Sequence, residues 1–329
     1  MAWRIIMRIG WRSNALLEML RVSWPGLVAI SILLSLGLIM PAGIMATIRN
    51  SLSYINLAIP WAIFYSLGYP SFATAAFYGI GAYVLTYTLL SGLSPLVGVI
   101  ASVLASFAIA LALGAITLRL AGLFFFFATL AILEAIGQLL RYTEITLTGH
   151  IGKIVPIIVS DQLSLSILAA LAVVNIAIYS YIMSTRHRIY IHTIRSDKVL
   201  ATSVGVNPYR YSSILFGVTS AMQAASGSIS AMYLLYIDPG SVFSPTISLL
   251  TLIIGLLGGY ANILGPIVSS IAIVFLYEYT SRIAPYVNLV ILGAIVMAFT
   301  LYLRTSLSDI IERLWPSRRS IIHYGRESR

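Results

Sequence analysis

The sequence predicts an all-α integral membrane protein with about ten transmembrane helices. Of its 329 residues, 59% are hydrophobic and 9% are charged, whereas about a quarter of the residues of a soluble domain are charged. The apolar residues form blocks of about 20, the length at which a helix crosses a hydrocarbon core of about 30 Å. Blocks such as 26–46 and 163–184 are apolar on all sides, so helices are favoured over the alternating strands of a β-barrel.

Ten apolar segments follow one another along the chain. They lie near 26–46, 52–68, 71–91, 95–118, 121–140, 163–184, 212–235, 247–259, 262–282 and 285–303. They define a transmembrane domain over 26–303, preceded by a basic N-terminal segment, 1–25, and followed by a basic tail, 304–329. The first apolar run is too long for the core of a cleavable signal, so we expect it to be the first span.

The distribution of arginine and lysine predicts the orientation. Cytoplasmic loops accumulate these residues, and here they concentrate in the N-terminal segment, the loop 185–211 and the tail. The longest loop on the other side, 141–162, is nearly neutral, and Arg49 is one mild exception. We therefore expect a plasma-membrane protein, surrounded by lipid, with both termini in the cytoplasm. No basic stripe runs along a soluble domain, so the net charge of +10 predicts no nucleic-acid partner.

Two stretches interrupt the apolar pattern. Residues 68–71 read Gly-Tyr-Pro-Ser, and residues 257–262 read Leu-Gly-Gly-Tyr-Ala-Asn. Paired Gly and Pro breaks in corresponding halves of a transporter often mark an internal repeat and the lining of a transport path. Two tight loops between ordinary spans explain the pattern equally well.

Motifs for catalysis are absent from the sequence. It contains no G-x-x-x-x-G-K-[ST] phosphate loop, no G-x-S-x-G and no H-E-x-x-H, and it has no cysteine. The histidines lack the spacing of a metal site; they are His150, His187, His192 and His323. We expect no catalysis, no metal and no cofactor in this chain.

The loop 195–208 predicts a two-turn helix outside the membrane. Ser196 can cap its start and Asp197 suits its first turn, while Gly205 suits the C-terminal cap. Pro208 lies beyond that cap. Such a short helix is marginal in water and needs a partner. The partner is either the protein's own span ends or lipid headgroups, or else a groove on a separate cytoplasmic subunit.

Four stretches of the sequence form a recognisable set. They are S-F-A-T-A-A-F-Y-G-I-G-A-Y at 71–83, A-T-L-A followed by Glu134, Ile194-Arg195 followed by Ala201-x-x-x-Gly205, and L-G-G at 257–259 with Gly-Pro at 265–266. In this order they resemble segments of the branched-chain amino-acid permease family of ATP-binding-cassette (ABC) importers, the third being that family's coupling loop. Together they span about residues 65–282.

The sequence departs from this family's pattern at several positions. Ala73 and Thr74 replace Gly-His, Thr202 stands where the coupling loop usually has Glu, and 148–150 reads Thr-Gly-His in place of Thr-Gly-Gly. These departures bear on the substrate more than on the fold.

The resemblance implies a permease with the type II ABC-importer fold. Such a subunit pairs with a second permease subunit, identical or different. Two cytoplasmic ATP-binding subunits, which carry ATP and Mg, dock on the coupling helices, and an extracytoplasmic solute-binding protein delivers the solute. A branched-chain or other neutral amino acid is the first expectation for the solute, with urea, short amides or sugars next.

The expected contact surface for the ATP-binding subunits is the segment 195–205. Its members are Arg195, Asp197, Lys198, Ala201, Thr202 and Gly205. We expect Asp197 and Lys198 to set polar pairing and Ala201 to allow close approach. A bulky or charged residue at 201 is then expected to uncouple ATP hydrolysis from uptake without unfolding the chain.

Polar residues inside spans are candidates for the translocation path, because placing them in lipid is costly. The selected candidates are Glu134, Gln138, Ser71, Thr74 and Asn262. Glu134 and Gln138 lie one turn apart on one helix face, and for Glu134 a functional and a structural role are equally supported.

Other residues within the spans favour structural roles. Further polar residues are Gln223, Asn175, Asn288 and Glu278, and for a single Asn or Gln interhelical hydrogen bonding is the favoured role. Small residues are expected to permit close helix packing; they are Gly227, Gly255, Gly258 and Gly259.

Two other functions remain as alternatives. A self-sufficient secondary transporter or channel explains the spans, the breaks and Glu134, but it does not explain the coupling-loop pattern. A membrane enzyme is disfavoured, since no His, Asp, Glu or Arg constellation gathers at one membrane face.

Overall fold

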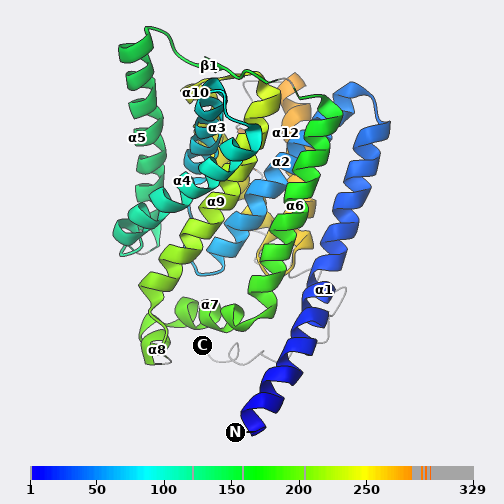
Figure 1. Ribbon diagram of the computed structural model, residues 1–329, viewed down its shortest axis with the longest axis vertical. Helices are drawn as coiled ribbons and strands as arrows, with labels where there is room; N and C mark the ends of the chain where they lie inside the picture. The colour runs from blue at the N-terminus through cyan, green and yellow to red at the C-terminus, as the bar shows by residue number, and fades with distance from the viewer. Residues whose placement is uncertain are drawn as a thin grey trace.

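The computed structural model describes residues 2–283 except 121, 158 and 204, together with 290, 291, 293, 294 and 297. The predicted last span, 285–303, lies largely outside these residues, and the tail 304–329 lies entirely outside them. The described part of the chain is helical apart from loops and a pair of two-residue strands (Figure 1). This agrees with the predicted all-α class.

The elements follow one another in a regular order. They are α1 (Ala2–Ile39), α2 (Ala42–Tyr65), α3 (Thr74–Leu90), α4 (Pro95–Thr117), α5 (Leu123–Thr148), β1 (Lys153–Ile154), α6 (Asp161–Ser184), α7 (Arg186–Ser196), α8 (Lys198–Ser203), α9 (Pro208–Leu234), β2 (Tyr236–Ile237), α10 (Pro239–Val242), α11 (Pro245–Gly258) and α12 (Leu264–Ile283).

Fewer than the predicted ten membrane crossings can be identified within the described residues. Within the described residues, six helical stretches are long and apolar enough to cross a membrane: Glu18–Ile39, Pro95–Thr117, Leu123–Leu147, Asp161–Ser184, Pro239–Gly258 and Leu264–Ile283. Helix α3 is apolar but has 17 residues, and α2 and α9 carry more polar side chains. Most residues of α2 and α9 are buried inside the bundle. Because these helices pack mainly against other helices and not against lipid, they carry more polar side chains. The count of ten is not confirmed.

The boundary between the first two helices lies earlier than predicted. The sequence suggested spans at 26–46 and 52–68 with a loop around Arg49, but α1 ends at Ile39 and Pro41 precedes α2. Proline disfavours helix at the residue before it, which ends α1 there. Arg49 lies inside α2 because its charge is paired with Asp161 at the start of α6.

Helix α1 is continuous through the predicted N-terminal segment 1–25. Its 38 residues correspond to about 57 Å at 1.5 Å per residue, well beyond the thickness of a hydrocarbon core. Its first turns extend past the rest of the bundle (Figure 1).

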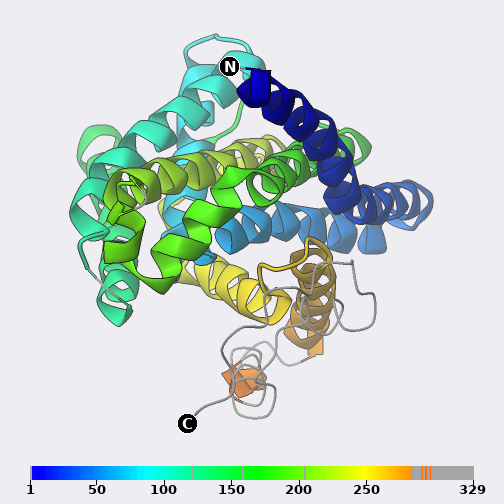
Figure 2. The same cartoon turned by 90° about the horizontal axis from the view of Figure 1, so that it is seen from below.

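The bundle has two distinct ends. Helices α7 and α8 lie at one end, and the β1–β2 ladder and α10 lie at the other (Figure 1). Seen from the α7 end, α2, α6 and α9 occupy the middle, while α5 stands at one edge (Figure 2). Helix α5 exposes large apolar side chains along its length, including Phe124, Phe127 and Leu139, and this surface suits lipid or another membrane subunit.

Helices α3 and α9 cross with their backbones in contact. A Cβ added to Gly227 would overlap the carbonyl oxygen of Tyr78, and one added to Gly81 would overlap that of Ala224. A Cβ added to Gly255 would overlap the ring of Trp61, and one added to Gly258 would overlap the backbone of Pro266. These contacts confirm the expected packing role of Gly227, Gly255 and Gly258, three of the four predicted glycines, while Gly259 follows α11 with φ +74°.

We expect Gly227→Ala to destabilise the protein by about 1–3 kcal/mol, because the added methyl group forces two helices apart. Gly43→Ala is the matched control, since a Cβ at Gly43 meets nothing within 4 Å. Thermal unfolding of the two purified variants in one detergent measures the difference. Equal melting temperatures would show that the α3–α9 crossing is not close-packed.

Asparagine side chains also link the helices. Asn175 of α6 donates to Oδ1 of Asn56 in α2 at 2.9 Å, and Asn56 donates to the carbonyl oxygen of Leu168 at 3.0 Å. The structural role favoured for Asn175 is therefore confirmed. Asn288 lies outside the described residues.

Candidate functional site

The segment 185–207 forms two helices where the sequence predicted one. Helix α7 ends at Ser196, and Asp197 adopts an extended conformation between α7 and α8. The Asp197 carboxylate accepts a hydrogen bond from the backbone nitrogen of Val199 at 2.7 Å. Asp197, and not Ser196, is thus the capping residue, because α7 continues through the position where a cap was expected.

The end of α8 follows the prediction. Gly205 has φ +82°, a conformation that glycine adopts without steric cost. The backbone nitrogen of Gly205 donates to Thr202 at 2.9 Å, and that of Val206 donates to Ala201 at 3.0 Å. This pair of hydrogen bonds is the Schellman motif of a helix C-terminus.

Arg195 joins α7 to both interrupted stretches of the sequence. Its Nη1 donates to the carbonyl oxygen of Ser66, just after α2, at 3.4 Å. Its guanidinium carbon lies 4.7 Å from the ring centroid of Tyr260 and 5.7 Å from that of Tyr65. Tyr260 belongs to the loop between α11 and α12. One side chain therefore contacts both breaks, which lie together at the α7 end of the bundle.

The other end of α7 is held by aromatic contacts. Nδ1 of His187 lies 3.1 Å from the hydroxyl oxygen of Tyr211 in α9, and the ring centroids of Tyr190 and Tyr211 lie 5.8 Å apart. Partial burial lowers the pKa of His187 below its ordinary value of 6.5. The lowered pKa favours the neutral imidazole in this aromatic cluster.

The exposed face of α8 differs from the predicted contact surface. Ala201 has no exposed surface, whereas Val199 is 71% exposed and Thr202 is also exposed. Nζ of Lys198 lies 5.2 Å from the ring centroid of Tyr69 and 5.4 Å from that of Tyr209. Lys198 and Ala201 therefore face their own chain, because α8 packs over the ends of the spans.

The first interrupted stretch leads from the α7 end of the bundle into buried, irregular backbone at 71–73. Between α2 and α3, the carbonyl oxygen of Ser71 accepts from Nε1 of Trp61 at 2.8 Å. The backbone nitrogen of Phe72 donates to Oγ1 of Thr129 at 2.9 Å. Irregular backbone at membrane depth requires such partners. The stretch therefore begins as a tight turn with Gly68 exposed at the α7 end of the bundle, and its last residues, 71–73, are buried.

Two predicted pathway residues lie close to the start of α3. Ser71 and Thr74 are both buried, and Oγ1 of Thr74 accepts from Nε2 of Gln223 in the middle of α9 at 3.3 Å. Ser248 of α11 accepts from the backbone nitrogen of Ala75 at 2.9 Å. Thr74 thus belongs to a buried polar cluster with Gln223 and Ser248, while the hydroxyl of Ser71 accepts from the backbone nitrogen of Ala73 at 3.3 Å. Asn262 lies apart, where its Oδ1 caps α12 by accepting from Leu264 at 3.1 Å.

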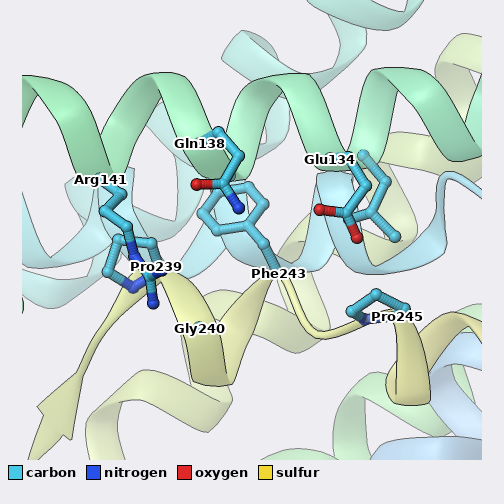
Figure 3. A pocket seen from close by; sticks show the side chains of 9 residues that line it. Glu134, Gln138, Arg141, Pro239, Gly240, Phe243 and Pro245 are labelled. Atoms are coloured by element: carbon cyan, nitrogen blue, oxygen red, sulfur yellow. The ribbon is translucent and has the colours of Figure 1, made fainter.

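Glu134 and Gln138 lie on the same side of α5, as their spacing predicted. Figure 3 shows their side chains and that of Arg141 directed toward the loop around α10. They line a pocket of about 120 Å³ together with Pro239 and Phe243. Both predicted residues are exposed on this chain. Arg141, which the sequence analysis placed in a loop, extends the same polar face by one further turn.

A second pocket of about 230 Å³ lies between α2, α3, α9, α11 and α12. Its lining residues are Asn50, Ser53, Tyr54, Leu57, Tyr78, Tyr233, Leu234, Ile247, Val274, Tyr277 and Glu278. Glu278 accepts from Nδ2 of Asn50 at 2.7 Å and from the hydroxyl of Thr47. Sequence reasoning placed Asn50 in a loop and missed this site. The spacing of Thr47, Asn50 and Tyr54 on one helix face was the signal available.

The comparison with known families agrees with the resemblance seen in the sequence. Residues 43–300 match the family described as branched-chain amino acid transport system / permease component. The match includes the interrupted stretches, α7, α8 and both pockets. Searches of curated proteins and of solved structures return no match to this chain. Since residues 43–300 make up well over half of the 329, the chain belongs to the permease component family of branched-chain amino acid transport systems.

Proposed function

We propose that this transport membrane subunit is the permease of an ATP-driven ABC importer. Its solute is a small polar molecule, with branched-chain and other neutral amino acids first, as the family's description suggests. It works with a second permease subunit, two cytoplasmic ATP-binding subunits that carry ATP and Mg, and an extracytoplasmic solute-binding protein. The chain itself hydrolyses no ATP.

The observation that carries the proposal is the position of α7 and α8. ATP binding can drive transport only through contacts that differ between two conformations of the pore. Helix α8 exposes Val199 and Thr202, while Arg195 next to it contacts Ser66 and Tyr260. A subunit that pulls on α8 thereby acts on α2 and on the loop before α12.

The proposed orientation follows from the basic residues. The loop 185–211, which contains α7 and α8, is rich in arginine, and such loops face the cytoplasm. The β1–β2 ladder and α10 then face the outside, where a solute-binding protein docks. In this orientation both termini lie in the cytoplasm.

Helix α5 supports the pairing with a second permease subunit. Leaving charged and polar groups open to lipid is costly, yet Glu134, Gln138 and Arg141 line a pocket on a largely apolar helix and remain exposed on this chain. A second subunit, or the solute path between two subunits, covers these groups without that cost. This supports a position of Glu134 and Gln138 in the path or at its border.

Reconstitution in vesicles tests the proposal. We expect accumulation of radiolabelled leucine only when the permease pair, the ATP-binding subunits, the solute-binding protein and ATP are all present. Omitting the ATP-binding subunits is the control. If this chain alone accumulates leucine from a proton or sodium gradient, it is a secondary transporter and the proposal is wrong.

A further inference from the structure

We propose that the pocket between α2, α9 and α12 binds a solute within a single chain, and that Glu278 selects solutes carrying a primary ammonium group. This inference rests on the proposed function and narrows its solute class. The pocket volume of about 230 Å³ lies below the range of about 300–1,000 Å³ that suits drug-sized ligands. It therefore suits one small molecule.

The carboxylate of Glu278 is fixed in place and still able to bind a cation. Asn50 and Thr47 of α2 donate to its two oxygens, and these hydrogen bonds orient it at the pocket wall. Its recorded ion-pair partner in the described part of the chain is Arg282, at 3.5 Å and with 65% of the side chain exposed. An exposed pair of this kind contributes little. An ammonium ion in the pocket gains a more sheltered contact with the same carboxylate.

Tyrosine rings complete a site for a cation. Tyr54, Tyr78, Tyr233 and Tyr277 line the pocket, and aromatic faces attract ammonium groups within about 6 Å of the ring centroid. The ring of Tyr233 already holds the guanidinium of Arg49, whose carbon lies 4.4 Å from the ring centroid, so the solute's ammonium group is assigned to Glu278 and the rings of Tyr54, Tyr78 and Tyr277. Urea, amides and sugars carry no charge, so they lack the charge attraction that an ammonium group has to the Glu278 carboxylate and to the aromatic faces.

The rest of the wall suits an aliphatic side chain. Leu57, Leu234, Ile247 and Val274 contribute apolar surface to the same pocket. A molecule with an ammonium group at one end and a branched hydrocarbon at the other therefore satisfies both kinds of wall. Its carboxylate, where present, has the Asn50 amide and the Ser53 hydroxyl within the lining.

The pocket adjoins the buried polar cluster at the start of α3. Tyr78 lies one helical turn after Thr74, which accepts from Gln223. The pocket also lies in the half of the bundle away from α7, because its walls are the first half of α2 and the last turns of α9 and α12. In the proposed orientation it receives solute from outside and passes it toward the interrupted stretch 68–71.

Cysteine protection tests the pocket directly. The natural chain has no cysteine, so Leu234→Cys introduces a single thiol. Leu234 lines the pocket and is 44% exposed, whereas its neighbour Leu235 is 45% exposed and does not line it. The full-length variants in lipid nanodiscs are labelled with a charged methanethiosulfonate. We expect saturating leucine to slow labelling of Leu234→Cys at least about fivefold and to leave Leu235→Cys unchanged, because bound solute shields only the pocket wall.

Leucine analogues and a charge variant identify the selected group. In the Leu234→Cys chain, 3-methylbutylamine, which lacks the carboxylate, is expected to protect, and 4-methylpentanoate, which lacks the amine, is not. Adding Glu278→Gln should raise the leucine concentration for half-protection about 10- to 100-fold, the loss typical of a hydrogen bond to a charged group. Tyr279→Phe, on an exposed neighbour of Glu278, is the control and should change nothing.

The outcomes separate this inference from the proposed function. Equal protection by 4-methylpentanoate and leucine overturns it, as does full protection in Glu278→Gln. If Glu278→Gln fails to fold, the analogue comparison in the chain that retains Glu278 decides alone. Absence of protection in an importer that takes up leucine with ATP overturns the pocket and leaves the importer standing. Protection by leucine without ATP-driven uptake supports the pocket and overturns the importer.

Discussion

Replacement of Arg195 by alanine is expected to reduce ATP-driven uptake at least about tenfold while ATP hydrolysis by the assembled complex continues. The variant removes a hydrogen bond from a charged donor to the Ser66 carbonyl and a cation–π contact with Tyr260. Interactions of these kinds contribute about 1.5–3 and 0.5–2 kcal/mol. Without them, α7 loses its contact with both interrupted stretches, so motion of α8 no longer reaches the spans.

Two further variants define what Arg195 contributes. Arg188→Ala removes the same charge from an exposed position on the same helix, and it should leave uptake near its normal level. Arg195→Lys keeps the charge but loses the planar group that stacks on aromatic rings, so an intermediate loss is expected. Uptake and hydrolysis are measured in the same vesicles at matched permease content. If both fall in proportion in Arg195→Ala, the residue supports assembly and not coupling.

Much of the fold could be predicted from local signals. The starts of α4, α6 and α9 lie within a few residues of the predicted spans, because each carries its own boundary. Pro95 opens α4, Ser160 caps α6 by accepting from Leu163, and Asn207 caps α9 by accepting from Arg210. These signals depend on neighbours in the sequence, which is why pattern alone locates them.

The α1–α2 boundary shows where local reading fails. An arginine at 49 followed by an asparagine at 50 is a pattern typical of a loop. The residue that pairs with Arg49, Asp161, lies 112 residues away in the sequence. Only the packing of α2 against α6 brings the two together. The same misplacement hid the pocket, since Asn50 and Tyr54 were placed in or beside a loop while Glu278 was noted as a single polar residue in a distant span.

The position of the candidate contact segment, 195–205, could be predicted from the sequence, but the face of α8 that packs against the chain could not. Gly205 and Pro208 marked its end correctly, and Arg195 was named among its members. The sequence could not show that Lys198 packs against Tyr69 and Tyr209. Which side of a two-turn helix faces inward is decided by those rings, which belong to other parts of the chain.

The second large effect is expected on the exposed face of α8. Val199→Asp should abolish co-purification of the ATP-binding subunits, since it places a charge on a residue that is 71% exposed and faces the proposed docking groove. Substitutions at exposed sites change folding stability by about 0.5 kcal/mol or less, so the melting temperature should not change. Val199→Ile keeps an apolar side chain and is the matched control.

Ala201→Leu should act differently from Val199→Asp, because Ala201 has no exposed surface. Added volume in a packed site costs about 1–3 kcal/mol, and the six-residue α8 shifts more easily than the spans beneath it. We therefore expect lower uptake with a slightly lower melting temperature and partial retention of the ATP-binding subunits. Normal co-purification with Val199→Asp would remove α8 as the docking surface. Loss of binding only with Ala201→Leu would show that the position of α8, and not its exposed face, determines docking.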